Sequence, residues 1–299
     1  MVQTMSFSEL EALRREKGLG VNVFLAVSGL SKSSYYRRKQ KAQTKTKELK
    51  EKRDQAIKAL CHEHPALGYR PIHALLLRHY PSLSCSASTV YRLMKALDLC
   101  QKPVKKKPVK STTTPLELES IGMTIGLDFT HWQKAPICNV LEYESRYALA
   151  TIVTDRETAQ AAKSVMELAL LEAQRLGLPT TGIEVKSDQG STFTAEVFED
   201  FLYNQGCQHS FSPVAVPQGM AKVERFNRSA KEQALAREEC DSKEAIQDVL
   251  DSYRQYYNSQ RPHQALGYKT PLDIIRQFQA GCIHPEGQRF RSKEKQKSG

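Results

Sequence analysis

The chain contains the stretch TIGLDFT at residues 124–130, an apolar run typical of a β-strand that one carboxylate, Asp128, interrupts. A second run of this kind, GIEVKSD at 182–188, ends in Asp188 just before a Gln-Gly turn. Farther along, QGMAKVERFNR at 218–228 has helical spacing and contains Glu224. Two strands and a helix that each present one carboxylate indicate a single acidic site.

The three acids are candidate ligands for metal ions. Mg²⁺ prefers oxygen ligands, and two ions about 3.5–4 Å apart stabilise the attacking and leaving oxygens of a phosphodiester displacement. Asp128, Asp188 and Glu224 therefore predict a catalytic site with two Mg²⁺ (or Mn²⁺) ions. One acidic residue at a strand end more often starts a turn, so the prediction depends on the order Asp, Asp, Glu with 35 residues between the last two.

The helix that contains Glu224 also presents polar and basic side chains. Asn227, Arg228 and Lys231 follow Glu224 by three, four and seven residues and so share its face. We expect these three residues to contact DNA. The alternative is a set of ordinary surface charge pairs, each contributing about 0.2–0.5 kcal/mol.

The charge is unevenly distributed along the 299 residues, a length that has room for two or three domains. Residues 1–118 contain 23 Lys and Arg against 9 Asp and Glu, whereas residues 119–286 contain 16 against 23. Residues 287–299 are basic again, with 5 against 1. This division favours DNA binding by the N-terminal region and chemistry in the acidic centre; the alternative is a soluble protein with charged ends.

The first 100 residues have the pattern of two helical DNA-binding modules. In residues 1–44, two short helical patterns are separated by a break at Gly29, and the second would offer Arg37 and Arg38 to DNA. In residues 45–100, we expect a charged helix from Lys45 to His64, a second over 71–78 and a third over 86–95. The third helix leaves Ser88, Thr89, Arg92 and Lys95 on its exposed side. Purely structural helix bundles remain the alternative.

Residues 101–118 alternate proline with lysine and predict an extended linker. Its residues Lys105, Lys106 and Lys107 would lie along a phosphate backbone, or would only form a solvated hinge. Residues 276–299 form a basic tail.

The region 119–275 predicts an α/β catalytic core. Strand-like runs at 123–132, 137–145 and 147–154 precede a helix over 158–176, a strand at 182–187, a helix over 194–205, a strand at 207–212 and a helix over 219–237. This order favours a mixed sheet with helices on both faces. We therefore expect a ribonuclease-H-like core preceded by all-α helix-turn-helix modules.

Seven scattered cysteines without a Cys-x-x-Cys pair indicate reduced thiols and a cytoplasmic protein. The cluster CHEH at 61–64 lacks a second ligand pair at zinc-finger spacing and is interpreted as a helix end. No apolar stretch approaches the roughly 20 residues that span a bilayer, so we expect no membrane role.

Longer motifs resemble a known family. YNSQRPHQALGYKTP at 257–271 is similar to the segment that closes the catalytic domain of insertion-sequence transposases of the IS-three family (OrfB type), which have a core like that of retroviral integrases. GYRPIH at 68–73 and VYRLM at 90–94 are similar to the helix-turn-helix before that domain. The resemblance extends over residues 20–275. Around Glu224, however, the chain has GMAKVERFN where the family often has an Asn-Ala pair, which leaves the subfamily open.

The resemblance implies a DDE transposase with Asp128, Asp188 and Glu224 as its metal-binding catalytic acids. It implies that Lys231 contacts DNA near the element end. The implied partners are double-stranded DNA (element ends and target), other copies of the chain in a homo-oligomer on DNA, and an upstream-frame protein with a helix-turn-helix and a leucine zipper. A domesticated DNA-binding protein and another ribonuclease-H-like nuclease are the alternatives.

Overall fold

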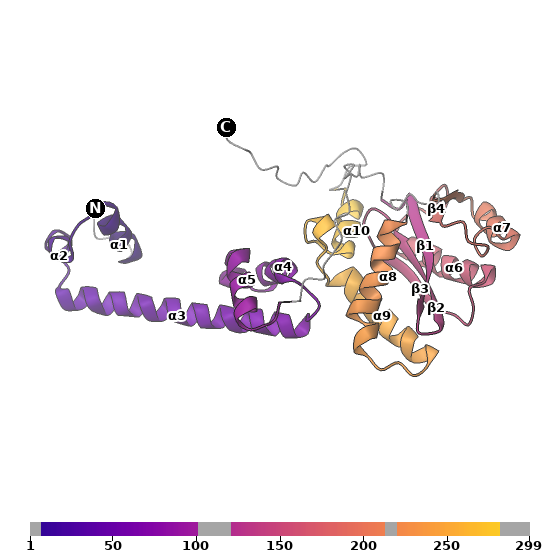
Figure 1. The fold of residues 1–299 in the computed structure, drawn as a ribbon. Coiled ribbons are helices and arrows are strands. Elements are labelled where there is room, and N and C mark those ends of the chain that lie inside the picture. Colours follow the sequence, from indigo (N-terminus) through magenta and orange to yellow (C-terminus); the bar gives the residue numbers. More distant parts are fainter. Residues whose placement is uncertain (1–6, 101–120, 213–219, 282–299) are drawn as a thin grey trace, which may run out of the picture. The chain divides into compact units, whose positions relative to one another are not determined.

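The structure is a computed structural model that describes residues 7–100, 121–212 and 220–281 (Figure 1). The chain divides into two compact units, Met1–Lys102 and Pro103–Gly299. In the part of the chain described, no helix is long and apolar enough to cross a membrane.

The first unit is helical and contains two small apolar cores. Leu10, Phe24 and Tyr35 form the first core, in which the Tyr35 hydroxyl also donates to Glu11 at 2.8 Å. The second core surrounds Ile57, and its other fully buried members come from the last three helices of the unit. The helices are α1 (Phe7–Glu16), α2 (Val21–Ser28), α3 (Lys32–Glu63), α4 (Tyr69–His79) and α5 (Ala87–Ala96), with a 3₁₀ turn at Pro81–Leu83.

Helix α3 is a single helix of 32 residues where the sequence predicts two. The prediction of a separate helix beginning at Lys45 was wrong. The segment KQKAQTKTKELK at 39–50 contains no Gly or Pro and consists mostly of good helix formers, so nothing in it ends a helix. The predicted break at Gly29 is confirmed: Gly29 ends α2 with φ 68°, and Ser31 caps α3 by accepting the Ser34 N–H.

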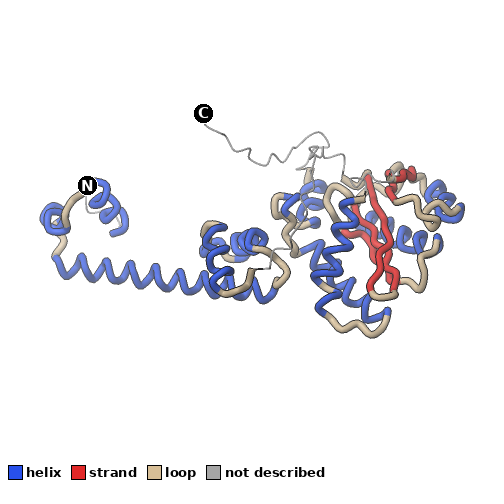
Figure 2. The backbone as a smooth tube through the Cα atoms, in the orientation of Figure 1, coloured by secondary structure: helices blue, strands red, loops and turns tan. Residues whose placement is uncertain are grey.

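The second unit is built on a mixed sheet. Among the described residues, five strands lie in the order β3-β2-β1-β4-β5, with β1–β2 and β2–β3 antiparallel and β1–β4 and β4–β5 parallel. Figure 2 shows the strands in red with helices beside them. The predicted α/β class and ribonuclease-H-like arrangement are confirmed. The strands are β1 (Thr124–Trp132), β2 (Ala135–Glu142), β3 (Ala148–Val153), β4 (Glu184–Ser187) and β5 (Gln208–Phe211).

Helices cover both faces of this sheet. One core packs α6, α7 and α10 on a face that includes Ile125 and Leu127, and the other packs α8 and α9 on a face that includes Ile137 and Leu141. Because side chains alternate along a strand, Gly126 and Asp128 face α8. The helices are α6 (Ala159–Arg175), α7 (Glu196–Asn204), α8 (Ala221–Gln233), α9 (Lys243–Ser259) and α10 (Pro271–Gln279).

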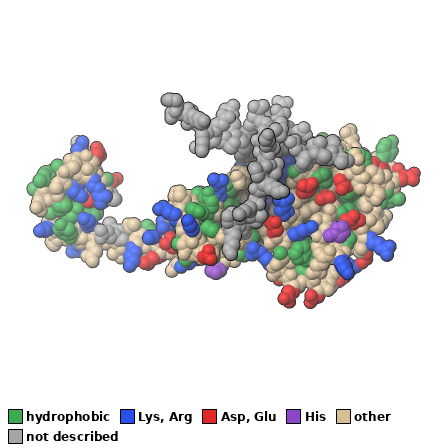
Figure 3. Space-filling view, viewed as in Figure 1, with side chains coloured by type: hydrophobic (Ala, Val, Ile, Leu, Met, Phe, Trp, Pro, Cys, Tyr) green, Lys and Arg blue, Asp and Glu red, His purple; other side chains and the backbone are tan. Residues whose placement is uncertain are grey.

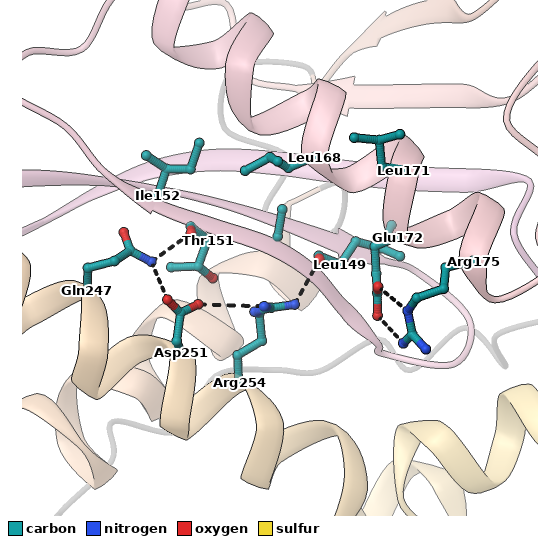
Figure 4. A pocket seen from close by; sticks show the side chains of 11 residues that line it. Leu149, Thr151, Ile152, Leu168, Leu171, Glu172, Arg175, Gln247, Asp251 and Arg254 are labelled. Carbon is teal, nitrogen blue, oxygen red and sulfur yellow. Dashed lines mark hydrogen bonds and ion pairs between the residues drawn. The ribbon is translucent and has the colours of Figure 1, made fainter.

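Side chains of α9 form hydrogen bonds with the backbone N–H and C=O groups at the outer edge of β3. Gln247 accepts the Val153 N–H at 2.8 Å and donates to the Thr151 carbonyl at 3.1 Å, and Arg254 donates to the Leu149 carbonyl at 3.1 Å. Asn258 both accepts from and donates to the backbone of Ala148, at 2.9 Å each. Figure 4 shows Gln247 and Arg254 reaching β3 beside a hollow of about 610 Å³ between α6, β3 and α9.

The ring of Tyr143 leaves no space for a side chain at position 126, so this position requires glycine. A Cβ at Gly126 would lie 2.2 Å from Cε2 of the buried Tyr143 ring, a contact that real Cβ atoms do not make. We therefore expect Gly126→Ala to lower the free energy of unfolding by about 1–3 kcal/mol, as overpacking does. The measurement is urea unfolding of the full chain. In a Tyr143→Leu background the same substitution should cost less, and an equal cost in both backgrounds would contradict the role of the ring.

Candidate active site

Asp128 lies in the middle of the central strand β1, opposite Asn139 of β2. Its side chain faces α8 and is half-buried. The Asn227 side-chain amide of α8 donates from Nδ2 to Asp128 Oδ2 at 2.8 Å. The first candidate acid is thus held between the sheet and the helix that contains Glu224.

Asp188 follows the last residue of β4 and is exposed. Since β4 pairs with β1 in parallel, the two acids lie on neighbouring strands. Asp188 Oδ1 accepts the Gly190 N–H at 2.9 Å, which fixes the turn after the strand. A Cβ at Gly190 would lie 3.0 Å from that oxygen, so glycine suits this position.

A second set of hydrogen bonds holds the backbone of Asp188. The Ser187 hydroxyl donates to the Asp188 carbonyl at 2.7 Å, and Ser187 Oγ lies 2.9 Å from His209 Nε2. His209 Nδ1 lies 2.8 Å from the Glu199 carboxylate. Strand β5 and helix α7 therefore help to fix the end of β4 from which Asp188 projects.

Glu224 occupies the first turn of α8 and is exposed. The helix packs through Val223, Phe226 and Ala230 on the second core, which leaves Glu224 at the border of the packed face. Lys231, two turns later, is half-buried. Burial lowers the pKa of the Lys231 ammonium, while the nearby Asp128 carboxylate opposes that shift.

The three acids interact electrostatically. Burial, followed by the charges of Asp188, Glu224 and Glu157, raises the pKa of Asp128 to about 7, against a lowering by Lys231. The charges of Asp188 and Glu224 thus act on Asp128 from the end of β4 and from α8. Neighbouring negative charges repel one another, and a bound cation relieves that repulsion.

An all-oxygen donor set of this kind suits Mg²⁺ or Mn²⁺. Within the described ranges, no group of three His, Cys, Asp or Glu side chains is drawn together tightly enough to hold one ion. The donor chemistry of the three carboxylates fits a divalent cation, but among the described residues their side chains do not converge on one point.

The predicted DNA-contacting residues have different environments. Arg37, Arg38, Ser88, Arg92 and Lys95 are exposed and Thr89 is half-buried, all on α3 and α5. On α8, Arg228 is exposed. On the face seen in Figure 3, basic side chains recur along α3 and α5, and acidic ones gather on the second unit. Lys105, Lys106 and Lys107 lie outside the described residues, as does the tail from 282 onward.

Asn227 differs most from its predicted environment, because it is buried and bonded inside the protein. Its Oδ1 accepts from Asn139 Nδ2 at 2.7 Å. Asn139, together with its neighbour Thr151, was missed in the sequence. The available signal was a polar residue inside the apolar run PICNVL at 136–141.

Comparisons with known proteins define the class of both units. Residues 122–217 and 205–271 match integrase core domains, and residues 48–107 match an HTH-like domain. Among solved structures, the catalytic core domain of BIV integrase is similar, with a TM-score of 0.42 and 23% identity over 54% of this chain and 98% of that one. The family matches thus indicate an integrase core that follows an HTH-like domain.

Its curated relatives come from insertion elements. A 31.7 kDa protein of element IS407 from Burkholderia multivorans is 26% identical, over 76% of this chain and 81% of the relative. Transposase InsD of IS2 from Escherichia coli is 25% identical over 72% and 75%, and the IS904 transposase of Lactococcus lactis is 32% identical over 32% and 38%. The predicted resemblance to OrfB-type insertion-element transposases is confirmed.

The raised pKa of Asp128 predicts a pH-dependent stability in metal-free protein. An unfolded aspartate loses its proton near the ordinary pKa of 3.8, whereas folded Asp128 keeps it until about pH 7. The stability contributed by this difference is present below pH 3.8 and is lost as the pH rises through 7. Wild type should therefore lose stability between pH 5 and pH 8, whereas Asp128→Asn should not. The Tm of the variant relative to wild type should rise over this range, by about 2–4 °C for each kcal/mol.

The measurement is thermal unfolding with a chelator at both pH values. The exposed Asp248→Asn on α9 is the matched control. A Tm difference between Asp128→Asn and wild type that is the same at pH 5 and pH 8 would contradict the prediction.

Proposed function

We propose that the chain is a DNA transposase that catalyses Mg²⁺-dependent strand cleavage and strand transfer at insertion-sequence ends. The observation that supports this most directly is the environment of Asp128, because burial, together with the charges of Asp188 at the end of β4 and Glu224 on α8, raises its pKa to about 7. An acid whose pKa is strongly shifted by burial and by neighbouring charges is typical of a functional site. The match to integrase core domains over residues 122–271 supports the same reaction class.

In this proposal Asp128, Asp188 and Glu224 hold two Mg²⁺ or Mn²⁺ ions. Bound ions of this kind activate the nucleophile and stabilise the leaving oxygen of a phosphodiester. The protein supplies three carboxylates and holds them in place. Asn227 fixes one oxygen of Asp128, and Gly190 and Ser187 fix the turn at Asp188.

In the same proposal, Lys231 binds a phosphate of the DNA beside the acids. It interacts with Asp128 yet is only half-buried, so its ammonium can contact both the site and a ligand. Exposed Arg228 lies on the same helix one turn earlier. Basic side chains position a negatively charged backbone, and they do not coordinate cations.

The N-terminal unit would bind the element ends. Ser88, Arg92 and Lys95 are exposed on α5, whose opposite face is buried through Val90 and Met94. This is the arrangement of a helix that reads the major groove. Arg37 and Arg38 on α3 would add phosphate contacts.

The remaining partners belong to the same proposal. Insertion requires two DNA ends and a target, so we expect a homo-oligomer on double-stranded DNA in the bacterial cytoplasm. An upstream-frame protein with a helix-turn-helix and a leucine zipper would add a further DNA contact.

Replacing the acids tests the catalytic assignment. Asp128→Asn, Asp188→Asn and Glu224→Gln each remove a charge but keep the shape of the side chain. We expect each variant to lose strand cleavage by several orders of magnitude, because loss of a metal centre costs several kcal/mol of transition-state stabilisation. Binding of element ends should stay nearly intact.

The measurements are cleavage of a labelled element end and a gel-shift assay with the same DNA. Cleavage that survives in any variant would contradict the active site. A wild-type chain that binds the ends without cutting them would support a domesticated DNA-binding protein. Cleavage without strand transfer would support another ribonuclease-H-like nuclease.

Lys231→Ala separates DNA positioning from metal binding. We expect a lower maximum rate, because a displacement of even ~1 Å of the scissile phosphate can cost about a hundredfold. The half-saturating Mg²⁺ concentration should not rise, since a like charge near the site is removed. The rate of end cleavage against Mg²⁺ concentration gives both quantities, and full rescue by excess Mg²⁺ would contradict the positioning role.

A further inference from the structure

A row of polar side chains crosses three neighbouring strands beneath α8. Asp128 of β1 pairs with Asn139 of β2, and Asn139 pairs with Thr151 of β3. Asn139 and Thr151 are buried, with 1% and 5% of their surface exposed. The neighbours of Asn139 along β2, Cys138 and Val140, are apolar and fully buried.

These side chains form one continuous hydrogen-bond chain that ends on Asp128. The Thr151 hydroxyl donates to Asn139 Oδ1 at 2.8 Å. Asn139 Nδ2 donates to Asn227 Oδ1 at 2.7 Å, and Asn227 Nδ2 donates to Asp128 Oδ2 at 2.8 Å. Four elements, β3, β2, α8 and β1, therefore meet in a single chain of bonds.

The chain runs in one direction only. A metal ligand is an ionised carboxylate, which can only accept hydrogen bonds, so in that state Asn227 turns its Nδ2 toward Asp128, as the 2.8 Å bond has it. Asn227 Oδ1 then faces Asn139 and can only accept, which turns Asn139 Nδ2 toward it. Asn139 Oδ1 is left to accept the hydroxyl of Thr151. The orientation of both amides is thus set by the carboxylate at one end, and the Thr151 hydroxyl, which can donate or accept, completes the chain at the other end.

Folding alone does not call for such a chain. Buried amides and hydroxyls carry a desolvation cost, and apolar side chains of similar volume are often as stable or more so. What the chain achieves is a fixed orientation of the Asp128 carboxylate. Among the described residues Oδ2 accepts the Asn227 bond, and no hydrogen bond to Oδ1 is formed there.

We propose that Asn139 and Thr151 are positioning residues that act through Asn227 to hold Asp128 Oδ2 and so leave Oδ1 to bind a divalent cation. This inference rests on the proposed function, because it takes Asp128 as a metal ligand. Residues that orient a ligand in this way typically contribute 10–100-fold to metal affinity.

The test measures Mn²⁺ affinity of the full chain without DNA, by calorimetry or by electron paramagnetic resonance. We expect Asn139→Leu to weaken binding about 10–100-fold. Thr151→Val removes only the last donor and should weaken Mn²⁺ binding less. Thr151→Ser keeps the hydroxyl and should bind Mn²⁺ as wild type does. The Thr151 variants change one group each, so they answer the question even if Asn139→Leu does not fold.

Two matched controls separate positioning from general stability. Thr124→Val removes a buried hydroxyl of β1 that bonds to Glu184, and Asn258→Leu removes the buried amide that bonds to Ala148. Neither belongs to the chain that ends on Asp128. Both should lower Tm and leave the Mn²⁺ affinity unchanged.

The outcomes distinguish this inference from the proposed function. If Asp188→Asn abolishes Mn²⁺ binding while Asn139→Leu and Thr151→Val bind like wild type, the positioning role is overturned and the metal site stands. Equal loss in the two controls also overturns it. If Asp188→Asn binds Mn²⁺ as wild type does, the metal site itself is wrong and this inference fails with it.

Discussion

The structure around α8 depends on the Asp128 carboxylate, which lies on the face of the sheet beneath this helix. Helix α8 crosses this face with Glu224 in its first turn, and Asp128, which faces the helix, is half-buried. A partly desolvated charge is costly unless it is hydrogen-bonded. Asn227 on α8 meets that requirement by donating to Asp128, and Asn139 on β2 in turn donates to Asn227.

The motif at 257–271, on which the family resemblance is based, has a structural role here. Tyr257 packs edge-on against Phe226 of α8 and against His263, with ring centroids 4.8 Å and 4.4 Å apart. Its neighbour Asn258 bonds to the backbone of β3. The motif therefore attaches α9 both to the sheet and to the helix that contains Glu224, which gives it an indirect effect on the site.

The sequence predicts the sheet, the acids and the helix of Glu224, because alternation and helical spacing are local patterns. It fails where a contact depends on neighbours distant in the chain. Helical spacing places Asn227 beside Glu224 and so favours an exposed DNA contact, yet packing on the sheet buries it. The link from Thr151 to Asn139 requires the register of β2 and β3, which no local pattern contains. The two helices expected around residue 44 are one because helix formers fill the junction.

The hydrogen bonds from α9 to β3 have a consequence for association. An edge strand with open N–H and C=O groups is a template on which another chain can add a strand, and natural proteins block such edges. Gln247, Arg254 and Asn258 already use these groups on β3. The opposite edge, β5, is only four residues long. Wherever copies of a chain meet at high local concentration, such a block disfavours extending one another's sheets into aggregates, and it leaves side-chain surfaces as the route for association.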